Sequence, residues 1–388
     1  MSQDVFWHDR AVMNIDKRDK VMIVSRSFRL VSTILLAGLI SFGCTGSKEE
    51  AVSQKSEEAL AYVSTQKGNV IVIDLKSMEV KGEIQVGAKG PRGIGVTADG
   101  KTLITANGED GDISVINRNT GELIKRIAIG ENPEFVRVRG EQVFVSYEPA
   151  AIGGPPPAPG SEEAEALAKA REEDEEEPAQ IAIVDLVKGE MVKAITGGME
   201  TEGIEFSADG KKILVTNEAD ENITVHDIDT GNLVKTISTQ AYGNRPRGIK
   251  AAPSGEYYVG SLEFGNKLVI IDSNFNLEKV VTTGKVPYGL AFDEKGERLF
   301  VALKQDKALE IFDTKSWESI KKIPTGERCW HFTFTPDNSQ ILVACGRSDE
   351  VVVIDMETLE PIKSIPVPNM PWGIVTYPKA IGSLDIPN

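Results

Sequence analysis

Cysteine and histidine are scarce in this chain of 388 residues. The three cysteines and three histidines are Cys44, Cys329, Cys345, His8, His226 and His331. Three cysteines are too few for a scaffold built on disulfides, and no CxxC or CxxCH pair is present to form a zinc ribbon or to attach haem covalently. The length is enough for one large domain or two ordinary ones, so the chain can fold around a hydrophobic core.

Basic charge and long apolar runs are also limited. The chain has 43 Lys and Arg against 59 Asp and Glu, a net charge of −16, whereas nucleic-acid binding requires a clustered Lys/Arg surface. The apolar run at residues 30–43 has 14 positions, and about 20 are needed to span a bilayer. We therefore exclude a nucleic-acid partner and expect no stable transmembrane helix from this run.

The N-terminal region is typical of an export signal. Arg26 and Arg29 precede the apolar run, as the positive region of a signal peptide precedes its apolar core. Cys44 follows, before the polar stretch TGSKEE, and this junction resembles a bacterial lipoprotein signal in which the cysteine accepts the lipid. We predict a signal peptide over residues 1–43, lipidation of Cys44, and a cell-envelope location on the outer or cytoplasmic membrane, facing the periplasm or the cell surface.

Two details qualify that prediction. Ser41 stands where lipoprotein signals usually have leucine, so an ordinary cleaved signal and a retained anchor are alternatives. Residues 1–21 contain four aspartates, and a start at Met22 would give a compact signal of ordinary length. Residues 44–58, rich in Ser, Lys and Glu after the cysteine, are expected to form a flexible tether.

An internal repeat is the strongest pattern in the sequence. An apolar strand that closes on Asp or Asn recurs seven times, at Asp74, Asn117, Asp185, Asp227, Asp272, Asp313 and Asp355. The spacings are 43, 68, 42, 45, 41 and 42 residues. Each unit contains four short strands separated by turn residues such as D-G and T-G, which is typical of a propeller blade. We predict an all-β fold over residues 59–378, a seven-bladed β-propeller with four-stranded antiparallel blades.

The ends of the repeat predict how the ring closes. Residues 59–65 read as a second strand without a first, and residues 371–378 as a first strand without a second. Joining them completes one blade from both ends of the chain and removes open sheet edges. Residues 379–388 remain as a C-terminal tail.

The repeat resembles a known family of propellers. The strand LVTN at 214–217, with weaker versions in LAYVST and ILVAC, is similar to the YVTN-type repeat of bacterial and archaeal surface proteins. The resemblance covers roughly residues 59–378 and implies the propeller fold. It leaves function open, because similar propellers include lactonase-like enzymes, quinoprotein amine dehydrogenase heavy chains and many binding proteins.

A candidate site follows from the blade-to-blade crossings, which surround the mouth of the central channel. The middle residues of the seven crossings are Arg92, Glu134, Glu202, Arg247, Tyr288, Trp330 and Trp372. Four charges in succession are followed by three aromatics, an arrangement that suits a planar or amphipathic organic ligand, or a peptide with one charged end. We call these seven the ring residues and predict that they bind a ligand. In the alternative, Arg92–Glu134 and Glu202–Arg247 are ion pairs of the channel, and the aromatics only fill it.

The two remaining cysteines lie close to this ring in the predicted hairpin. Cys329 is expected to face Cys345 or its neighbour on the next strand. A cross-strand disulfide, two unpaired buried thiols, and a copper or zinc site from Cys329, His331 and Cys345 are the three alternatives. No metal or cofactor is predicted as resident, and His226 is expected to be a packing residue within its strand.

Residues 148–179 interrupt the third unit with a Pro-rich and then acidic insertion. Residues 161–178 hold nine acidic and two basic side chains, and Ser161 is placed to begin a short helix. The insertion leaves the fold on the same face as the ring residues. It is either a solvated acidic loop or a flap that attracts a basic partner or metal ions.

These features favour binding over catalysis. No nucleophile–base pair or phosphate-binding glycine loop is present, and histidines are too few for a haem d1-like or metallohydrolase site. We predict a monomeric cell-envelope lipoprotein that binds a protein or small-molecule ligand at the channel mouth without catalysis. The alternatives are an accessory protein of a periplasmic quinoprotein or metalloprotein redox system, and a lactonase-like hydrolase holding a divalent metal on Glu134 and Glu202.

Overall fold

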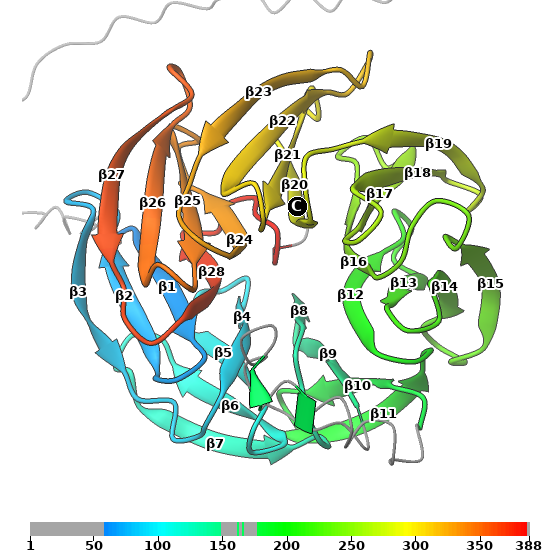
Figure 1. Cartoon of the computed structure of the whole chain (residues 1–388). Coiled ribbons are helices and arrows are strands. Elements are labelled where there is room, and N and C mark those ends of the chain that lie inside the picture. The colour runs from blue at the N-terminus through cyan, green and yellow to red at the C-terminus, as the bar shows by residue number, and fades with distance from the viewer. Residues whose placement is uncertain (1–57, 149–160, 163–164, 167–176, 386–388) are drawn as a thin grey trace, which may run out of the picture. The chain divides into compact units, whose positions relative to one another are not determined.

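In the described part of the computed structural model, 28 strands form seven antiparallel sheets arranged around a central axis (Figure 1). We call the side-chain-filled space along this axis the channel. The structure describes residues 58–148, 161–162, 165–166 and 177–385. The predicted signal peptide, Cys44, the tether up to residue 57 and most of the acidic insertion therefore lie outside the described residues. The predicted all-β seven-bladed propeller is confirmed.

Each blade contributes one strand to each of four concentric positions, and the strands of each position follow in order from blade 1 to blade 7. The innermost strands are β28 (Pro371–Tyr377), β4 (Pro91–Val96), β8 (Val136–Arg139), β12 (Thr201–Phe206), β16 (Pro246–Ala251), β20 (Pro287–Phe292) and β24 (Cys329–Phe334). The second strands are β1 (Leu60–Thr65), β5 (Thr102–Asn107), β9 (Gln142–Tyr147), β13 (Lys212–Asn217), β17 (Tyr257–Leu262), β21 (Arg298–Leu303) and β25 (Gln340–Cys345).

The third strands are β2 (Val70–Asp74), β6 (Asp112–Asn117), β10 (Gln180–Asp185), β14 (Asn222–Asp227), β18 (Lys267–Asp272), β22 (Ala308–Asp313) and β26 (Glu350–Asp355). The outer strands are β3 (Glu79–Ile84), β7 (Leu123–Ala128), β11 (Glu190–Thr196), β15 (Leu233–Ser238), β19 (Leu277–Thr282), β23 (Ser319–Pro324) and β27 (Glu360–Pro366). Burial follows this order: the first three positions are nearly continuous buried runs, whereas the outer strands are largely exposed because only one face packs against a neighbouring blade.

The recurring Asp or Asn at the end of each third strand has a local cause. Asp74 Oδ1 accepts hydrogen bonds from the backbone N–H groups of Lys76 and Ser77, at 2.9 and 2.7 Å. These bonds, the one from Ser77 above all, lower the pKa of the Asp74 carboxyl. A short polar side chain that accepts backbone donors two and three residues ahead fixes the tight turn into the outer strand, which explains why the repeat closes on this residue type.

The ring closes as predicted, with strands from both ends of the chain in blade 1. β28 pairs with β1 in antiparallel register, with Leu60 opposite Tyr377 and Val63 opposite Ile374. The sheet order β28-β1-β2-β3 then matches the order in every other blade. Ser64 Oγ, at the end of β1, also receives a hydrogen bond from the backbone of Gly373 at 3.1 Å.

Lysines of the outer strands connect successive blades. Each donates from Nζ to a backbone carbonyl in the turn before the outer strand of the next blade. The pairs are Lys125–Gly189 (3.2 Å), Lys193–Ile228 (2.7 Å), Lys235–Asn274 (3.3 Å), Lys321–Thr358 (3.4 Å) and Lys363–Ser77 (3.2 Å). The last pair crosses the closure between blade 7 and blade 1. Hydrophobic clusters between neighbouring sheets supply the rest of the core.

The propeller has two faces, which carry different connections. The turns from first to second and from third to outer strands share one face, the turn face. The loops from second to third strands and the blade-to-blade crossings share the other, the crossing face. No helix among the described residues is long and apolar enough to cross a membrane.

Candidate functional site

All seven ring residues lie where the crossings enter the innermost strands, at the crossing side of the channel. The side chains are closed off from solvent: Tyr288, Trp330 and Trp372 are 4, 3 and 2% exposed, and Arg92 and Glu202 are buried. Only Glu134 and Arg247 are partly buried. The ring residues are therefore brought together, and their side chains fill the mouth of the channel.

The charged half of the ring contains the two ion pairs that the sequence offered as the alternative. Arg92 Nη1 lies 3.1 Å from Glu134 Oε2 and donates to Asn132 Oδ1 at 3.3 Å. Arg247 Nη1 binds Glu202. A carboxylate committed to a buried guanidinium is a poor ligand for a divalent ion, so the lactonase-like metal site on Glu134 and Glu202 gains no support from this geometry.

Arg247 is also the centre of a larger network. Its Nη2 lies 2.8 Å from Glu218 Oε2, and its Nε lies 2.6 Å from Glu263 Oε2. Glu263 pairs in addition with Lys304. Burial alone would raise the pKa of Glu263, but Arg247 and Lys304 outweigh it and lower that pKa to about 2. Burial lowers the pKa of Lys304 to about 7, against the opposing effect of Glu263.

The alignment of the crossings did not identify three residues of this network, although a different alignment of the repeats would have done so. Glu218, Glu263 and Lys304 each immediately follow a second strand, in blades 4, 5 and 6. Aligning the residue after every second strand would have found this column, because that position meets the neighbouring crossing on the same face.

The aromatic half of the ring packs around a histidine. The His331 ring centre lies 4.3 Å from that of Trp372, 5.5 Å from that of Tyr288 and 5.6 Å from that of Phe135. Burial lowers the pKa of His331 well below its usual value, and Arg137, Lys250 and Arg247 add to the effect. The imidazole is therefore neutral, and this half of the mouth is an apolar plug.

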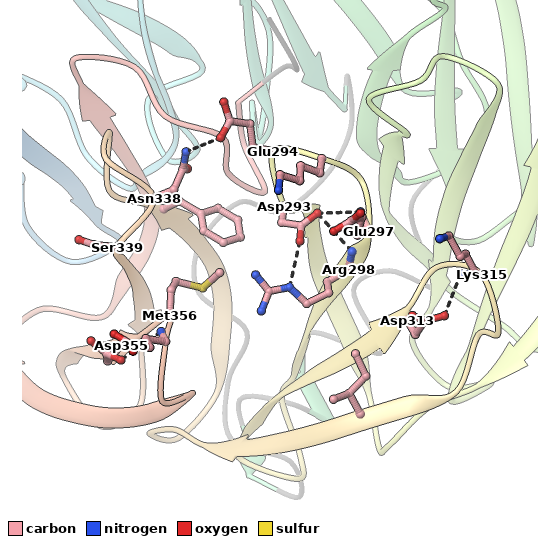
Figure 2. A pocket seen from close by; sticks show the side chains of 14 residues that line it. Asp293, Glu294, Glu297, Arg298, Asp313, Lys315, Asn338, Ser339, Asp355 and Met356 are labelled. Atoms are coloured by element: carbon pink, nitrogen blue, oxygen red, sulfur yellow. Dashed lines mark hydrogen bonds and ion pairs between the residues drawn. The ribbon is translucent and has the colours of Figure 1, made fainter.

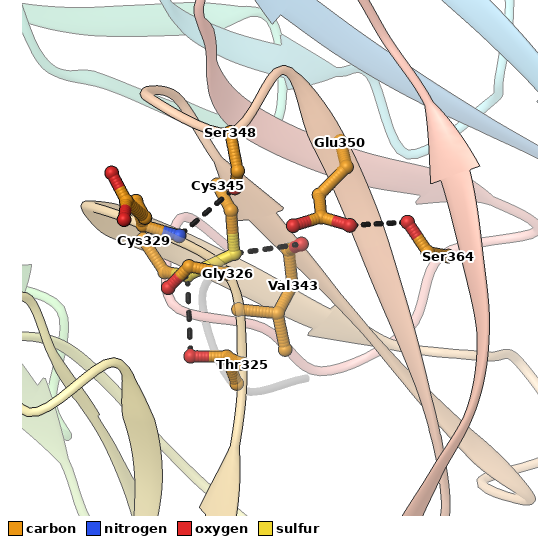
Figure 3. Close-up of a disulfide and its surroundings, with 9 residues drawn as sticks. Thr325, Gly326, Cys329, Val343, Cys345, Ser348, Glu350 and Ser364 are labelled. Atoms are coloured by element: carbon orange, nitrogen blue, oxygen red, sulfur yellow. Dashed lines mark hydrogen bonds between the residues drawn. A yellow bond between two sulfur atoms is a disulfide. The ribbon is translucent and has the colours of Figure 1, made fainter.

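The two cysteines form a disulfide beside the ring (Figure 3). Cys329 and Cys345 are directly opposite each other on β24 and β25. Since the disulfide uses both thiols, the structure selects the first of the three alternatives, and the copper or zinc site with His331 is not formed. Among the described residues, no group of three or more His, Cys, Asp or Glu is placed to hold a metal ion.

Gly346, the residue after Cys345 of the disulfide, determines where the Trp330 side chain lies. A Cβ added to Gly346 would lie 1.8 Å from Cζ3 of the Trp330 ring, far inside van der Waals contact. Only glycine leaves room for the indole there, and Arg328 covers the ring with its Cζ 5.3 Å from the ring centre. The disulfide-bonded hairpin and Gly346 therefore position the side chain of Trp330.

A second charged layer lies deeper in the channel, and the aligned crossings did not predict it. Arg137, Glu205 and Lys250 are 1, 1 and 2% exposed, each three positions after a ring residue on the innermost strands of blades 3, 4 and 5. Lys250 Nζ lies 3.8 Å from Glu205 Oε2. Charged residues within otherwise apolar innermost strands were the available signal. We call these three residues the turn-side layer.

Open clefts lie on the turn face, opposite the ring residues. The larger, of about 830 Å³, lies between the turns of blades 6 and 7 (Figure 2). Two of its acidic side chains have partners within the cleft: Asp293 accepts a hydrogen bond from Arg298 at 2.9 Å, and Glu294 accepts one from Asn338 at 3.1 Å. A smaller cleft of about 320 Å³ shares Glu294 and Asn338 with it and reaches the channel at Lys250.

The crossing face carries two exposed aromatic side chains. Phe264 is 59% exposed and Tyr242 is 36% exposed, the only aromatics among the exposed large hydrophobic residues that the structure describes. Their loops touch, because a Cβ at Gly243 would lie 2.3 Å from Cα of Gly265. Arg245 stacks on Phe264, with Cζ 5.0 Å from the ring centre, and pairs with Glu218 and Glu263 of the buried network.

Comparison with known proteins supports the fold. The cytochrome D1 heme domain family matches residues 177–307. Hydrazine synthase from Kuenenia stuttgartiensis superposes with a TM-score of 0.62 at 20% identity, over 76% of this chain and 92% of that one. A candidate 6-phosphogluconolactonase from Bacteroides uniformis superposes with a TM-score of 0.64 at 14% identity, over 82% and 100%. No curated protein matches the chain significantly. At these identities the likeness shows the propeller fold alone, in agreement with the predicted resemblance to lactonase-like propellers.

The residues do not fit a haem in the channel. The segment matched by the heme domain family contains one histidine, His226, whose Nε2 lies 2.9 Å from Thr224 Oγ1 within β14. The space around His331 is filled by the rings of Phe135, Tyr288 and Trp372. The two arginines of the ring, Arg92 and Arg247, which could otherwise bind the acidic groups of a haem, are paired with Glu134, Glu202, Glu218 and Glu263.

Proposed function

We propose that this chain is an exported, lipid-anchored β-propeller that binds a partner protein on its crossing face without catalysing a reaction. One observation carries the proposal: the exposed aromatic pair Phe264 and Tyr242, with Arg245 stacked between solvent and the buried ion network. Exposed aromatics and arginine on a rigid support are the residues that dominate binding energy at protein interfaces. The buried network holds Arg245 at two carboxylates and so limits its freedom before binding.

The acidic insertion supports a basic partner. The described chain reaches it from Tyr147, at the end of β9, and leaves it at Gln180, at the start of β10. Both ends are on the crossing face, and residues 161–178 carry an excess of seven negative charges. Such a charge, connected to the face that carries the aromatic pair, would speed the approach of a positively charged partner and make association depend on salt.

Site-specific photo-crosslinking in the native host tests this proposal. A photoreactive phenylalanine analogue at position 264 should give a discrete adduct with one protein. The same analogue at Ile320, an exposed residue of β23, is the matched control and should give none. Phe264→Ala should then lower affinity for the captured partner at least tenfold, because hot-spot residues typically contribute about 2 kcal/mol or more. Equal labelling from both positions would refute a binding site on the crossing face.

The lipid anchor has its own test. Cys44→Ala should abolish incorporation of a clickable palmitate analogue and release the protein from the membrane fraction. Ser41→Leu is the opposing variant, because it restores the residue usual at that signal position, and it should retain or increase labelling. Labelling that persists in Cys44→Ala would overturn the proposed acceptor.

A second candidate function is supported by the matches themselves. The heme domain family and the hydrazine synthase structure both connect propellers of this shape with redox proteins. In this reading the chain is an accessory protein of a periplasmic redox system, and the partner captured at position 264 is a quinoprotein or metalloprotein. Absorbance and metal analysis of the captured complex distinguish the redox function from binding of another kind of partner. A coloured or metal-containing partner favours the redox function, and a colourless, metal-free partner refutes it.

A further inference from the structure

The last described residues of the chain occupy the channel. After β28 the chain turns back, and residues 379–385, the channel segment, enter the ring beside β24 (Figure 1, red). The backbone N–H of Phe334 donates to the Ile381 carbonyl, and that of Ser383 donates to the Phe332 carbonyl, both at 2.9 Å. Leu384 is 2% exposed. The segment therefore lies along β24 on the turn side of the ring residues.

The turn-side layer holds this segment by its carbonyl oxygens. Arg137 donates to the carbonyls of Ser383, at 3.2 Å, and Leu384. Lys250 Nζ donates to the carbonyl of Asp385. Two buried cations from different blades thus bind three successive residues of the chain's own C-terminal region.

Charge balance in this layer depends on the channel segment. Arg137 and Lys250 bring two basic side chains, although burial lowers the pKa of Lys250 to about 7. From the blades, the carboxyl group of Glu205 pairs with Lys250. Asp385, itself 5% exposed, adds a second carboxyl group to this layer. Burial raises the pKa of this carboxyl, and Lys379, Lys250 and Arg137 oppose that rise. Because an uncompensated buried charge is strongly unfavourable, the blades alone leave a cavity that selects for a carboxylate.

The fit of the segment in this cavity is incomplete. Asp385 Oδ2 and Glu205 Oε2 are buried without a hydrogen-bond partner, and such atoms lose their hydration without replacement. The segment pairs with β24 through one isolated bridge, between Thr333 and Gly382, together with hydrogen bonds of Ser383 Oγ to His331 and to the Phe332 backbone, in contrast to the continuous ladders of the blades. A cleft of about 320 Å³ on the turn face is lined by Lys250 and by Lys379 at the base of the segment, so an entry path adjoins the cationic pair.

We propose that the turn-side half of the channel is a binding site for an organic carboxylate, and that the channel segment occupies it as a removable intramolecular competitor. When the segment withdraws, the ligand carboxylate binds Arg137 and Lys250 in place of the backbone carbonyls of the segment and of the Asp385 carboxyl group beside them. This site lies on the face opposite Phe264, so its failure or success is independent of the proposed partner binding.

Fluorescence anisotropy with a labelled peptide tests the proposal on the full mature chain. The probe is KAIGSLDIPN, the sequence of residues 379–388. Leu384→Ala weakens docking of the chain's own segment, so this variant should bind the peptide at least tenfold more tightly than the unaltered chain. Adding Lys250→Met to that variant should reduce peptide affinity at least tenfold. Ile362→Ala, at an exposed residue of β27, is the control and should match the unaltered chain.

Competition separates the two sources of a carboxylate. Displacement of the peptide by succinate would assign the site to small free carboxylates. Resistance to succinate, with loss of binding by the peptide that has Asn in place of Asp, would assign it to acidic peptides. Equal binding of the Asp and Asn peptides would overturn the proposal, and so would absence of peptide binding by a folded Leu384→Ala chain.

Amide hydrogen exchange of the unaltered chain reports directly on whether the channel segment leaves its site. A ligand that replaces the segment should accelerate amide exchange of residues 381–385 in proportion to its concentration, with β25 and β26 unaffected. Exchange that stays constant up to saturating peptide and succinate would refute a removable segment.

Discussion

The two charged layers of the channel reach neutrality by different routes. In the layer around Arg247, which we call the crossing-side layer, the carboxylates of Glu202, Glu218 and Glu263 are balanced by Arg245, Arg247 and Lys304, all contributed by the blades and their crossings. In the turn-side layer the blades supply two cations and one carboxylate, and Asp385 of the channel segment supplies the other. A charged layer whose basic and acidic side chains all come from the blades stays together for as long as the ring is folded. A layer completed by a terminal segment can open without unfolding the ring, because only that segment has to move.

The largest loss of stability is expected when the ion network of the crossing-side layer is broken. Arg247→Met should destabilise the protein by about 3–5 kcal/mol, because it leaves buried carboxylates without their shared cation. Urea unfolding monitored by circular dichroism measures the change. Lys307→Met is the control: this lysine pairs with Glu327 at the surface, where their side chains are 54 and 53% exposed, and its removal should cost less than about 1 kcal/mol. Similar losses in both variants would show that the crossing-side layer does not act as a network.

The next effect is a pH dependence that belongs to the same layer. The pKa of Glu263 is lowered from 4.5 to about 2, so the unfolded chain binds more protons than the folded one between these values. Stability is therefore complete above pH 4.5 and falls as the pH drops towards 2, by about 3 kcal/mol for this group. Glu263→Gln should lose less stability over that range than the unaltered chain. Parallel pH profiles for the two proteins would contradict this assignment.

The smallest loss of global stability is expected when docking of the channel segment in the turn-side layer is weakened. Leu384→Ala should reduce global stability by no more than about 2 kcal/mol, because the channel segment can undock before its full contact energy is lost. Amide exchange should become faster at residues 381–385 and remain unchanged in β25. The same substitution at Leu342, a fully buried residue of β25, should cost about 2–5 kcal/mol of global stability. If Leu384→Ala instead destabilises the whole ring to that extent, the two layers are equivalent.

The propeller could be predicted from sequence because its signals are local and repeated. The Asp or Asn that ends each third strand reports a turn made within a few residues, and seven copies at nearly constant spacing leave little choice of architecture. Even the closure followed, since residues 59–65 and 371–378 each lacked a partner strand.

The candidate site was predicted only in part, because its remaining contacts depend on tertiary structure. The crossings placed Arg92 near Glu134 and Arg247 near Glu202, and both ion pairs formed. Glu218 and Lys304 come from a different strand position, which a single aligned column does not sample. The channel segment lay beyond the repeat, where no periodicity indicates that Asp385 returns to the axis. Exposure of Phe264 is likewise a property of the assembled surface.

The lysine contacts between blades have a consequence for how such a ring can arise. Blades 3, 4 and 7 carry both a lysine donor on the outer strand and an acceptor carbonyl in the turn before it, whereas blades 2 and 6 supply only the donor and blades 1 and 5 only the acceptor. Because the acceptor is a backbone carbonyl, which does not depend on the side chain in that turn, a gene segment encoding one blade can be duplicated or lost in frame without creating a mismatched junction. Lys363 and Ser77 join the last copy to the first by the same contact. Blade number is then limited by the geometry of closure, and the junction chemistry imposes no limit of its own.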